Sequence, residues 1–198
     1  MILRTVARAA ALTAIATIGS LTLSACGSGI SGGGGQTNYV SGADDISTVA
    51  KSDRSPVGSI EGETLKGKHL DVRDLRGKVV VINIWGSWCP PCRAEAPYFN
   101  KVAKEMKSKG VEFVGINTRD SGKRLPRAFE KEYGVSYESL YDPTGKLILS
   151  GFPKGTVSIQ GVPATVILDK EGKIAARTFG GVDGTKLHKM IDPVVAEK

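Results

Sequence analysis

The stretch of sequence from Lys78 to Cys92 reads KVVVINIWGSWCPPC. Its first part, Lys78–Trp85, is rich in β-branched residues and almost continuously apolar, which is the pattern of a strand buried on both faces of a sheet. Prolines suit the first turn of a helix, where their missing N–H groups cost little. The stretch therefore predicts a buried strand that passes directly into a helix, with Cys89 and Cys92 in the first helical turn.

The residues on both sides of this stretch predict the other elements of an α/β domain. An apolar stripe at helical spacing runs from Cys92 to Met106, and this helix is expected to end at Lys109–Gly110. Val111–Asn117 is a second buried strand, and the strand–helix–strand order implies a parallel pair with a right-handed crossover. The remaining predicted elements are a loop and helix over Arg119–Tyr133, a short strand over Tyr137–Tyr141, a turn over 142–145, antiparallel strands over Ala164–Leu168 and Lys173–Gly180, a closing helix over Asp183–Val195 and a small N-terminal hairpin over Leu65–Leu70.

The composition is that of an ordinary globular protein, with 40% hydrophobic and 24% charged residues among 198. The formal net charge is +7, but basic and acidic residues are interleaved, and the sequence has no basic stripe with aromatic residues. We therefore expect a solvated surface and no nucleic acid partner, with weak attraction to anionic lipid as the alternative interpretation of the charge. The three cysteines, Cys26, Cys89 and Cys92, are too few for a structural disulfide framework.

The first part of the chain has the features of an export signal. Residues 1–8 include Arg4 and Arg8 but no acid, and Ala9–Leu23 is apolar and uncharged, which matches the two opening regions of a secretory signal peptide. The apolar run is shorter than the ~20 residues that a transmembrane helix needs. Removal of the two arginines with the signal would leave a formal charge of 7 − 2 = +5.

The end of this apolar run, Leu23-Ser24-Ala25-Cys26, resembles the lipobox of bacterial lipoproteins. The resemblance implies that residues 1–25 are a lipoprotein signal peptide and that the thiol of Cys26 carries a lipid, which would anchor the protein to the cell membrane at its extracytoplasmic face. Ordinary signal cleavage that leaves a free thiol is the alternative. Residues 26–55 are rich in Gly and Ser, so we interpret them as a flexible tether, with a marginal helical turn over Asp44–Ala50, and we place the folded domain at 56–198.

Two cysteines separated by two residues also occur in zinc sites, but zinc needs further ligands. The sequence has no second cysteine pair, and His69 and His188 are isolated, so we predict neither a metal site nor a cofactor. The N-terminus of a helix presents unpaired N–H groups and a partial positive charge, and both stabilise a thiolate. We therefore predict that Cys89 is the attacking nucleophile and that Cys92, one turn further along, resolves the mixed disulfide.

With these motifs the sequence resembles membrane-anchored proteins of the TlpA/ResA type, which belong to the thioredoxin superfamily. The resemblance covers nearly all of Pro56–Lys198; it is carried by Arg76–Pro97, which includes the cysteine pair, and by Gly161–Thr165, which matches the superfamily's cis-proline loop. It implies a thioredoxin-like α/β fold, in which a central mixed β-sheet is flanked by helices. It also implies an N-terminal β-hairpin and a central insertion between Asn117 and Ala164.

The resemblance further implies roles for residues around the cysteines. A cis bond before Pro163 would place Val162 and Pro163 against the sulfurs and let the backbone of Val162 pair with an extended partner segment; a trans proline in a turn is the alternative. Glu95 stands where ResA-like proteins carry a buried active-site glutamate, which implies proton transfer and tuning of the cysteine pKa; a surface helix glutamate is the alternative. Asn83 stands where thioredoxin itself has a buried aspartate, and this departure makes Glu95 the expected proton acceptor.

Two more side chains flank the cysteine pair. Trp88 is expected either to cover Cys89 and contact partners or to serve packing alone. Arg93 is interpreted as a surface charge, with stabilisation of a thiolate as the alternative.

These features predict dithiol–disulfide exchange with protein partners outside the cytoplasm. The resemblance implies reduction, for example of the cysteines of apocytochrome c before haem attachment, with electrons supplied by a CcdA/DsbD-type membrane protein. A disulfide-forming oxidant or isomerase for exported proteins is the alternative enzyme. A non-catalytic, lipid-tethered binding module is a further alternative, and the intact cysteine pair, Glu95 and Pro163 argue against it.

Overall fold

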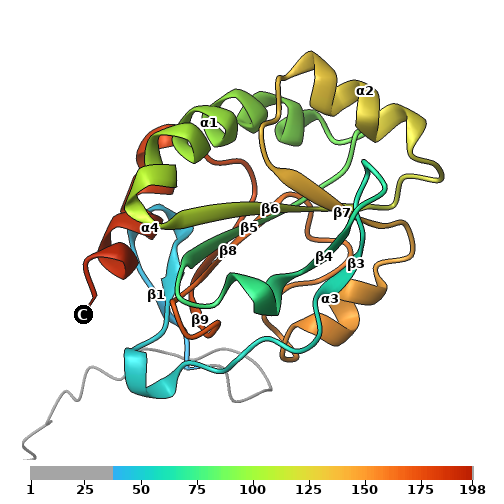
Figure 1. Cartoon of the computed structure of the whole chain (residues 1–198). Coiled ribbons are helices and arrows are strands. Elements are labelled where there is room, and N and C mark those ends of the chain that lie inside the picture. The colour runs from blue at the N-terminus through green and yellow to red at the C-terminus, as the bar shows by residue number, and fades with distance from the viewer. Residues whose placement is uncertain (1–37, 198) are drawn as a thin grey trace, which may run out of the picture. The chain divides into compact units, whose positions relative to one another are not determined.

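The computed structural model describes residues 38–197 (Figure 1). The predicted signal peptide, the predicted lipid site Cys26 and the first part of the predicted tether, residues 26–37, lie outside the described residues. The strands are β1 (Val40–Ser41), β2 (Ser47–Thr48), β3 (Glu61–Glu63), β4 (His69–Asp71), β5 (Val79–Trp85), β6 (Val111–Thr118), β7 (Glu138–Asp142), β8 (Ala164–Leu168) and β9 (Ile174–Phe179). The α-helices are α1 (Pro90–Met106), α2 (Arg124–Glu132), α3 (Lys146–Gly151) and α4 (Gly184–Val195), and short 3-10 turns lie at Ala43–Asp45, Lys51–Asp53, Val72–Leu75 and Lys107–Lys109.

A mixed sheet with the strand order β1-β2-β9-β8-β5-β6-β7 forms the centre of the domain. Strand β5 is parallel to β6, with Val79 opposite Val111 and Trp85 opposite Asn117, and antiparallel to β8. Every residue of β5 is buried. The predicted buried strand, the parallel crossover through α1 and the antiparallel return of β8 and β9 are therefore confirmed.

The alternation of side chains along β5 divides the core into two layers. Val79 and Val81 face the layer beneath α1 and α4, whereas Val80, Ile82 and Ile84 face the layer that includes Ile148 of α3. Figure 1 shows α1 and α4 together on one face of the sheet. A strand that is buried on both faces can hold a polar side chain only where that side chain is paired. Asn83 of β5 is therefore expected to have a hydrogen-bond partner.

Helix α1 begins at the cysteine pair. Cys89 is the N-cap residue, prolines occupy the first helical positions, and Pro97 lies inside the helix. The helical stretch ends, after a 3-10 turn, at Gly110, whose φ of 75° lies in the left-handed region that suits glycine. Both predicted ends of the helix are confirmed. None of the helices in residues 38–197 is long and apolar enough to cross a membrane.

The central insertion between β6 and β8 adds α2, β7 and α3 to the domain. Strand β7 lies parallel to β6 and forms the edge of the sheet, one residue beyond the predicted Tyr137–Tyr141. The sequence predicted only a turn after it, and α3 was missed. The carboxylate of Asp142 accepts hydrogen bonds from the N–H groups of Leu147 at 2.9 Å and Ile148 at 3.4 Å, so this side chain supports the start of a short helix that has little periodicity of its own. The N-terminal hairpin is confirmed as β3 and β4; the predicted Leu65–Leu70 covers its turn and the start of β4, whereas β3 precedes it.

The boundary between tether and domain at residue 55 is wrong. Strand β2 pairs with β9 through Ser47 opposite Arg177, and β1 pairs with β2, so the sheet begins near residue 40. Ile46 and Val49 are buried, although the surrounding segment is polar and glycine-rich. The predicted helical turn is limited to Ala43–Asp45. The open edge of β9 supplies backbone partners to a segment whose composition alone indicates no structure.

Arg54 fixes the end of this N-terminal segment to the domain. Its guanidinium contacts the carboxylate of Asp169 at 3.1 Å and that of Glu197 at 2.6 Å. The side chains of Arg54 and Asp169 are each only 6% exposed, so both charges depend on this pairing.

We expect Arg54→Met to lower the free energy of unfolding by roughly 3 kcal/mol, because the variant keeps the apolar stem but leaves Asp169 buried without its cation. The measurement is urea unfolding of the purified protein. Arg73→Met is the matched control: its guanidinium is 51% exposed and pairs with Glu61 and Asp71, so its loss should lower stability by less than about 1 kcal/mol. Equal losses in the two variants would contradict a structural role for residues before 56.

Candidate active site

The two cysteines lie where β5 passes into α1. Their sulfurs are bonded at 2.06 Å, and the backbone N–H of Cys92 donates to Cys89 Sγ at 3.2 Å. This N–H belongs to the first turn of α1, so the partial positive charge of the helix N-terminus points at the Cys89 sulfur. The arrangement is suited to stabilise a Cys89 thiolate once the bond is reduced.

Exposure does not distinguish the two sulfurs in this closed form. Cys89 is 2% exposed and Cys92 is 1% exposed. The difference lies in their hydrogen bonding, because the helix N–H is directed at Cys89 Sγ. The geometry therefore supports Cys89 as the thiolate through its helix contact, and the roles of nucleophile and resolving cysteine stay predictions.

The loop before β8 approaches the cysteines as predicted. The Val162–Pro163 peptide bond is cis, and Val162 packs against the buried cluster that contains Trp85, Cys89 and Cys92. The carbonyl of Pro163 accepts a hydrogen bond from Gly180 at 2.9 Å, which ties the loop to the end of β9. The N–H of Val162 donates to the carbonyl of Gln160 at 3.0 Å, so in this form the N–H that was expected to meet a partner is used within the loop.

Glu95 is buried, and the alternative of a surface glutamate is wrong. It is 2% exposed, the amide of Asn83 donates to its Oε1 at 2.9 Å, and the N–H of Val182 donates to its Oε2 at 3.2 Å. Burial raises the pKa of Glu95 to about 8, against the opposing effect of the two hydrogen bonds and of Lys186. A carboxyl one helical turn from Cys92 therefore titrates in the range in which thiols titrate.

Asn83 pairs with the buried carboxyl of Glu95. It lies on β5, is 4% exposed, and its amide donates to Glu95. A neutral amide at this place can donate a hydrogen bond to Glu95 in either protonation state, whereas a second carboxylate would repel it. The amide at position 83 is thus suited to the presence of Glu95.

Trp88 is packed in part, and its contact with partners stays a prediction. Its indole N–H donates to the carbonyl of Thr118 at 3.4 Å, and its ring lies so close to Gly86 that a Cβ there would stand 2.5 Å from it. The side chain is nevertheless 43% exposed, and the Arg119 guanidinium lies 4.5 Å from the ring centre. One part of Trp88 packs on its own loop, and the rest faces solvent.

A buried carboxylate that the sequence analysis missed holds the loop before Cys89. Asp120 accepts hydrogen bonds from the Ser87 N–H at 2.9 Å, from the Ser87 hydroxyl at 2.5 Å and from the Asn117 amide at 2.8 Å. Tyr141 adds a bond from its hydroxyl to the Asp120 carbonyl at 3.0 Å. The sequence signal for Asp120 was its place just after β6, because the carboxyl ends of parallel neighbours such as β5 and β6 meet at the same edge of a sheet.

Arg93 is more than a surface charge. Its guanidinium donates to the carbonyl of Ser87 at 2.8 Å and lies 5.9 Å from the ring centre of Phe129. The two histidines lie elsewhere, His69 near Glu61 and His188 near Glu105. Within residues 38–197, no three or more His, Cys, Asp or Glu side chains gather into a set that could ligate a metal ion.

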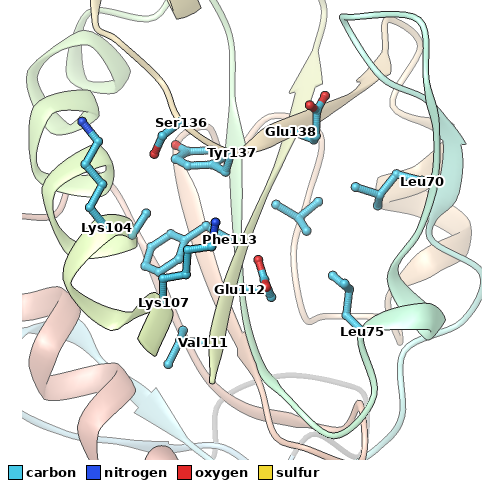
Figure 2. A pocket seen from close by; sticks show the side chains of 12 residues that line it. Leu70, Leu75, Lys104, Lys107, Val111, Glu112, Phe113, Ser136, Tyr137 and Glu138 are labelled. Carbon is cyan, nitrogen blue, oxygen red and sulfur yellow. The ribbon is translucent and has the colours of Figure 1, made fainter. Parts of the chain in front are cut away.

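A cavity of about 270 Å³ lies away from the cysteines (Figure 2). Figure 2 shows Lys104 and Lys107 on one side of it, Leu70 and Leu75 on the other, and Phe113 and Tyr137 between them. It forms beside the start of β6, because β7 first pairs with β6 at Val114. Neither the cysteines nor Glu95 line this cavity, so the disulfide lies outside this pocket.

Comparison with known proteins agrees with this geometry. The profile of the family described as Redoxin matches residues 50–191. A protein named thiol-disulfide oxidoreductase ResA, from Bacillus cereus, is 34% identical over 116 residues, which are 59% of this chain. The match spans 63% of the length of that relative.

Solved structures give similar results. A DsbF homologue from Corynebacterium diphtheriae is 34% identical, with a TM-score of 0.71 over 81% of this chain and 99% of the other. A secreted thiol-disulfide isomerase from Corynebacterium glutamicum is 29% identical, with a TM-score of 0.73 over 83% of this chain and 100% of the other. The predicted thioredoxin-like α/β fold is confirmed.

Stability of the oxidised protein should fall between pH 5 and pH 8 because of Glu95. With a pKa near 4.5 in the unfolded chain and about 8 in the folded protein, this carboxyl makes the folded state bind more protons within that window. The free energy of unfolding therefore falls as the pH rises, by on the order of 5 kcal/mol in total. Glu95→Gln should remove most of this pH dependence. Urea unfolding of both proteins at pH 5, 7 and 9 measures the difference.

Glu132→Gln, which changes an exposed glutamate of α2, is the matched control and should follow the wild-type curve. Parallel curves for wild type and Glu95→Gln would show that the buried carboxyl does not titrate in this window. Use of the oxidised form removes the cysteines from the titration.

Proposed function

The chain belongs to the Redoxin family, and from this premise we propose that it is a thiol–disulfide oxidoreductase that acts on protein partners. The observation that carries the proposal is the contact of the α1 N-terminus with the Cys89 sulfur, in the cluster against which the cis Val162–Pro163 loop packs. A helix N–H directed at one sulfur of a pair favours attack by that sulfur as a thiolate.

The proposed exchange has two steps. In the reduced protein the Cys89 thiolate attacks one sulfur of the partner's disulfide, forms a mixed disulfide and releases the other partner sulfur as a thiolate. Cys92 then gives its proton to the Glu95 carboxylate and attacks Cys89 Sγ, which forms the Cys89–Cys92 bond and releases the second partner thiolate. Two electrons pass to the partner, whose two sulfurs take up two protons from Glu95 and solvent.

The surroundings of the cysteines are assigned supporting roles. Val162 and Pro163 are proposed to receive an extended segment of the partner, mainly through the Val162 carbonyl, since its N–H is bonded within the loop. The exposed part of Trp88 is proposed to contact the same segment.

We propose that the direction is reduction and that the partner cysteines are those of apocytochrome c, with a CcdA/DsbD-type membrane protein as electron donor. The buried Glu95 supports this direction. A buried carboxyl close to the sulfurs opposes a stable thiolate when it is ionised, which favours the disulfide form of the pair and hence the reductant. The alternative, a disulfide-forming oxidant or isomerase, is supported by the name of the Corynebacterium glutamicum neighbour.

We also propose that the protein acts outside the cytoplasm, held to the cell membrane by lipid on Cys26. The support is the sequence Leu23-Ser24-Ala25-Cys26 after an apolar run. Cys26→Ser should move the protein from the detergent phase to the aqueous phase on Triton X-114 partition of cells that express the full chain, with Cys92→Ser as a control that stays in the detergent phase. Equal partition of wild type and Cys26→Ser would contradict the anchor.

Cys92→Ala tests the exchange itself. The variant keeps the Cys89 thiol but lacks the resolving sulfur, so a mixed disulfide should persist for at least 100-fold longer than in the wild type. The reduced variant is mixed with an oxidised apocytochrome c peptide and, separately, with an unrelated secreted protein that holds a disulfide, and the adducts are followed by mass spectrometry. Cys89→Ala, which keeps only the other sulfur, is the control.

Faster capture of the apocytochrome peptide supports the specific reductase, and equal capture of both supports the general oxidant or isomerase. Failure of Cys92→Ala to form an adduct with either disulfide would contradict thiol–disulfide exchange by Cys89.

A further inference from the structure

Arg119 is held beside the cysteines by the residues on both sides of it. The carbonyl of Thr118 accepts the hydrogen bond from the Trp88 indole, and the carboxylate of Asp120 accepts those from Ser87. Arg119 itself has a φ of 61°, in the left-handed region that a non-glycine residue rarely adopts. This backbone leaves its side chain exposed, with the guanidinium 4.5 Å from the centre of the Trp88 ring.

A second guanidinium reaches the same loop from α1. Arg93 lies one turn beyond Cys89, and its guanidinium donates to the Ser87 carbonyl at 2.8 Å. The segment Ser87–Trp88, which leads directly into Cys89, is therefore contacted by a cation from each of two elements. We name Arg93 and Arg119 the guanidinium rim.

The charge of the guanidinium rim is not matched by surface carboxylates. Among the ion pairs of residues 38–197, none involves Arg93 or Arg119. The acid of this region, Asp120, is 5% exposed and directs its oxygens at Ser87 and Asn117. A partner that meets Cys89 therefore meets two cations that have no exposed counter-ion of their own.

The opposite side of the site carries acids together with lysines. Gly181 approaches Pro91 there, and the neighbouring acids Asp44 and Asp183 are engaged, Asp44 with Lys189 at 2.6 Å and Asp183 with the N–H of Lys186 at 2.8 Å. The guanidinium rim therefore supplies the cations that contact the segment leading into Cys89.

We propose that the guanidinium rim selects partner segments that carry Asp or Glu next to the reacting cysteine. The inference rests on the proposed thiol–disulfide exchange and names the substrate class of that site. Opposite charges raise the rate of encounter and lower the energy of the docked state, and both effects weaken with salt. For charges roughly 8 Å apart in water, each pair changes a rate about twofold, so two guanidinium groups facing one carboxylate give about fivefold.

The test compares three small symmetric disulfides as probes of the reduced, full-length protein at low ionic strength. They are 3,3′-dithiodipropionate, which is anionic, 2-hydroxyethyl disulfide, which is neutral, and cystamine, which is cationic. The quantity measured for each is the ratio of the wild-type to the variant rate constant, because this ratio cancels the intrinsic reactivity of the probe.

Arg119→Glu should slow the anionic probe about fivefold, speed the cationic probe by a similar factor and leave the neutral probe within about twofold. Arg119→Lys should retain most of the preference, and Arg119→Gln should lose about half of it; these variants serve where Arg119→Glu does not fold. At 1 M salt, where the screening length is about 3 Å, the differences should collapse.

Lys109→Glu is the matched control, because it makes the same change in net charge in the 3-10 turn after α1, about 25 Å along the helical stretch from its start. An equal effect of Lys109→Glu and Arg119→Glu, or ratios that are the same for all three probes, would overturn the proposal while thiol–disulfide exchange stands. If the reduced wild type reacts with none of the probes, the proposed function fails instead.

Discussion

Strand β5 has no free surface. Parallel β6 and antiparallel β8 occupy its two edges, and one layer of the core covers each of its faces. A strand held in this way cannot shift in register without moving its apolar side chains to the wrong face. The chain leaves it at Trp85 and enters α1 at Pro90, so the position of Cys89 is set by the sheet and not by the short loop between them. Every other part of the site is placed relative to this transition.

Three polar side chains around that transition, Glu95, Asn83 and Asp120, are buried at an energetic cost, and each of these three is hydrogen-bonded. Glu95 and Asn83 join α1 to β5, and Asp120 joins the end of β6 to Ser87. An apolar core at these places would stabilise the fold more, because burial of an ionisable group opposes folding whenever the group is charged. Local conflicts of this kind in an otherwise consistent domain are typical of positions retained for chemistry.

The parts of the structure that the sequence predicted are those with a local signal. The apolar run of β5, the prolines at the start of α1 and Gly110 at its end each specify their conformation within a few residues. Residues 40–55 gave no such signal, because their order comes from the edge of β9 and from the distant acids that bind Arg54. Helix α3 likewise depends on Asp142.

The candidate site divides in the same way. The cysteines were found from their spacing and context, and Glu95 from family resemblance, since helical spacing alone does not show that it is buried. Asp120 and the stacking of Arg119 on Trp88 were missed because they join segments that only the parallel register of β5 and β6 brings together. Non-local pairing of this kind leaves no periodicity in the chain.

The atom that caps α1 is also the atom for which we propose nucleophilic attack, since the Cys92 N–H is directed at Cys89 Sγ. Folding and reduction therefore form a closed thermodynamic cycle. The difference in unfolding free energy between the reduced and oxidised protein equals the difference in reduction free energy of the cysteine pair between the folded and unfolded chain, on a scale of about 1.4 kcal/mol per 30 mV. Stabilisation of the Cys89 thiolate by the helix makes the pair more oxidising, and an ionised Glu95 makes it more reducing. The reduction potential of this disulfide therefore depends on the contact at the start of α1 and on the charge of Glu95.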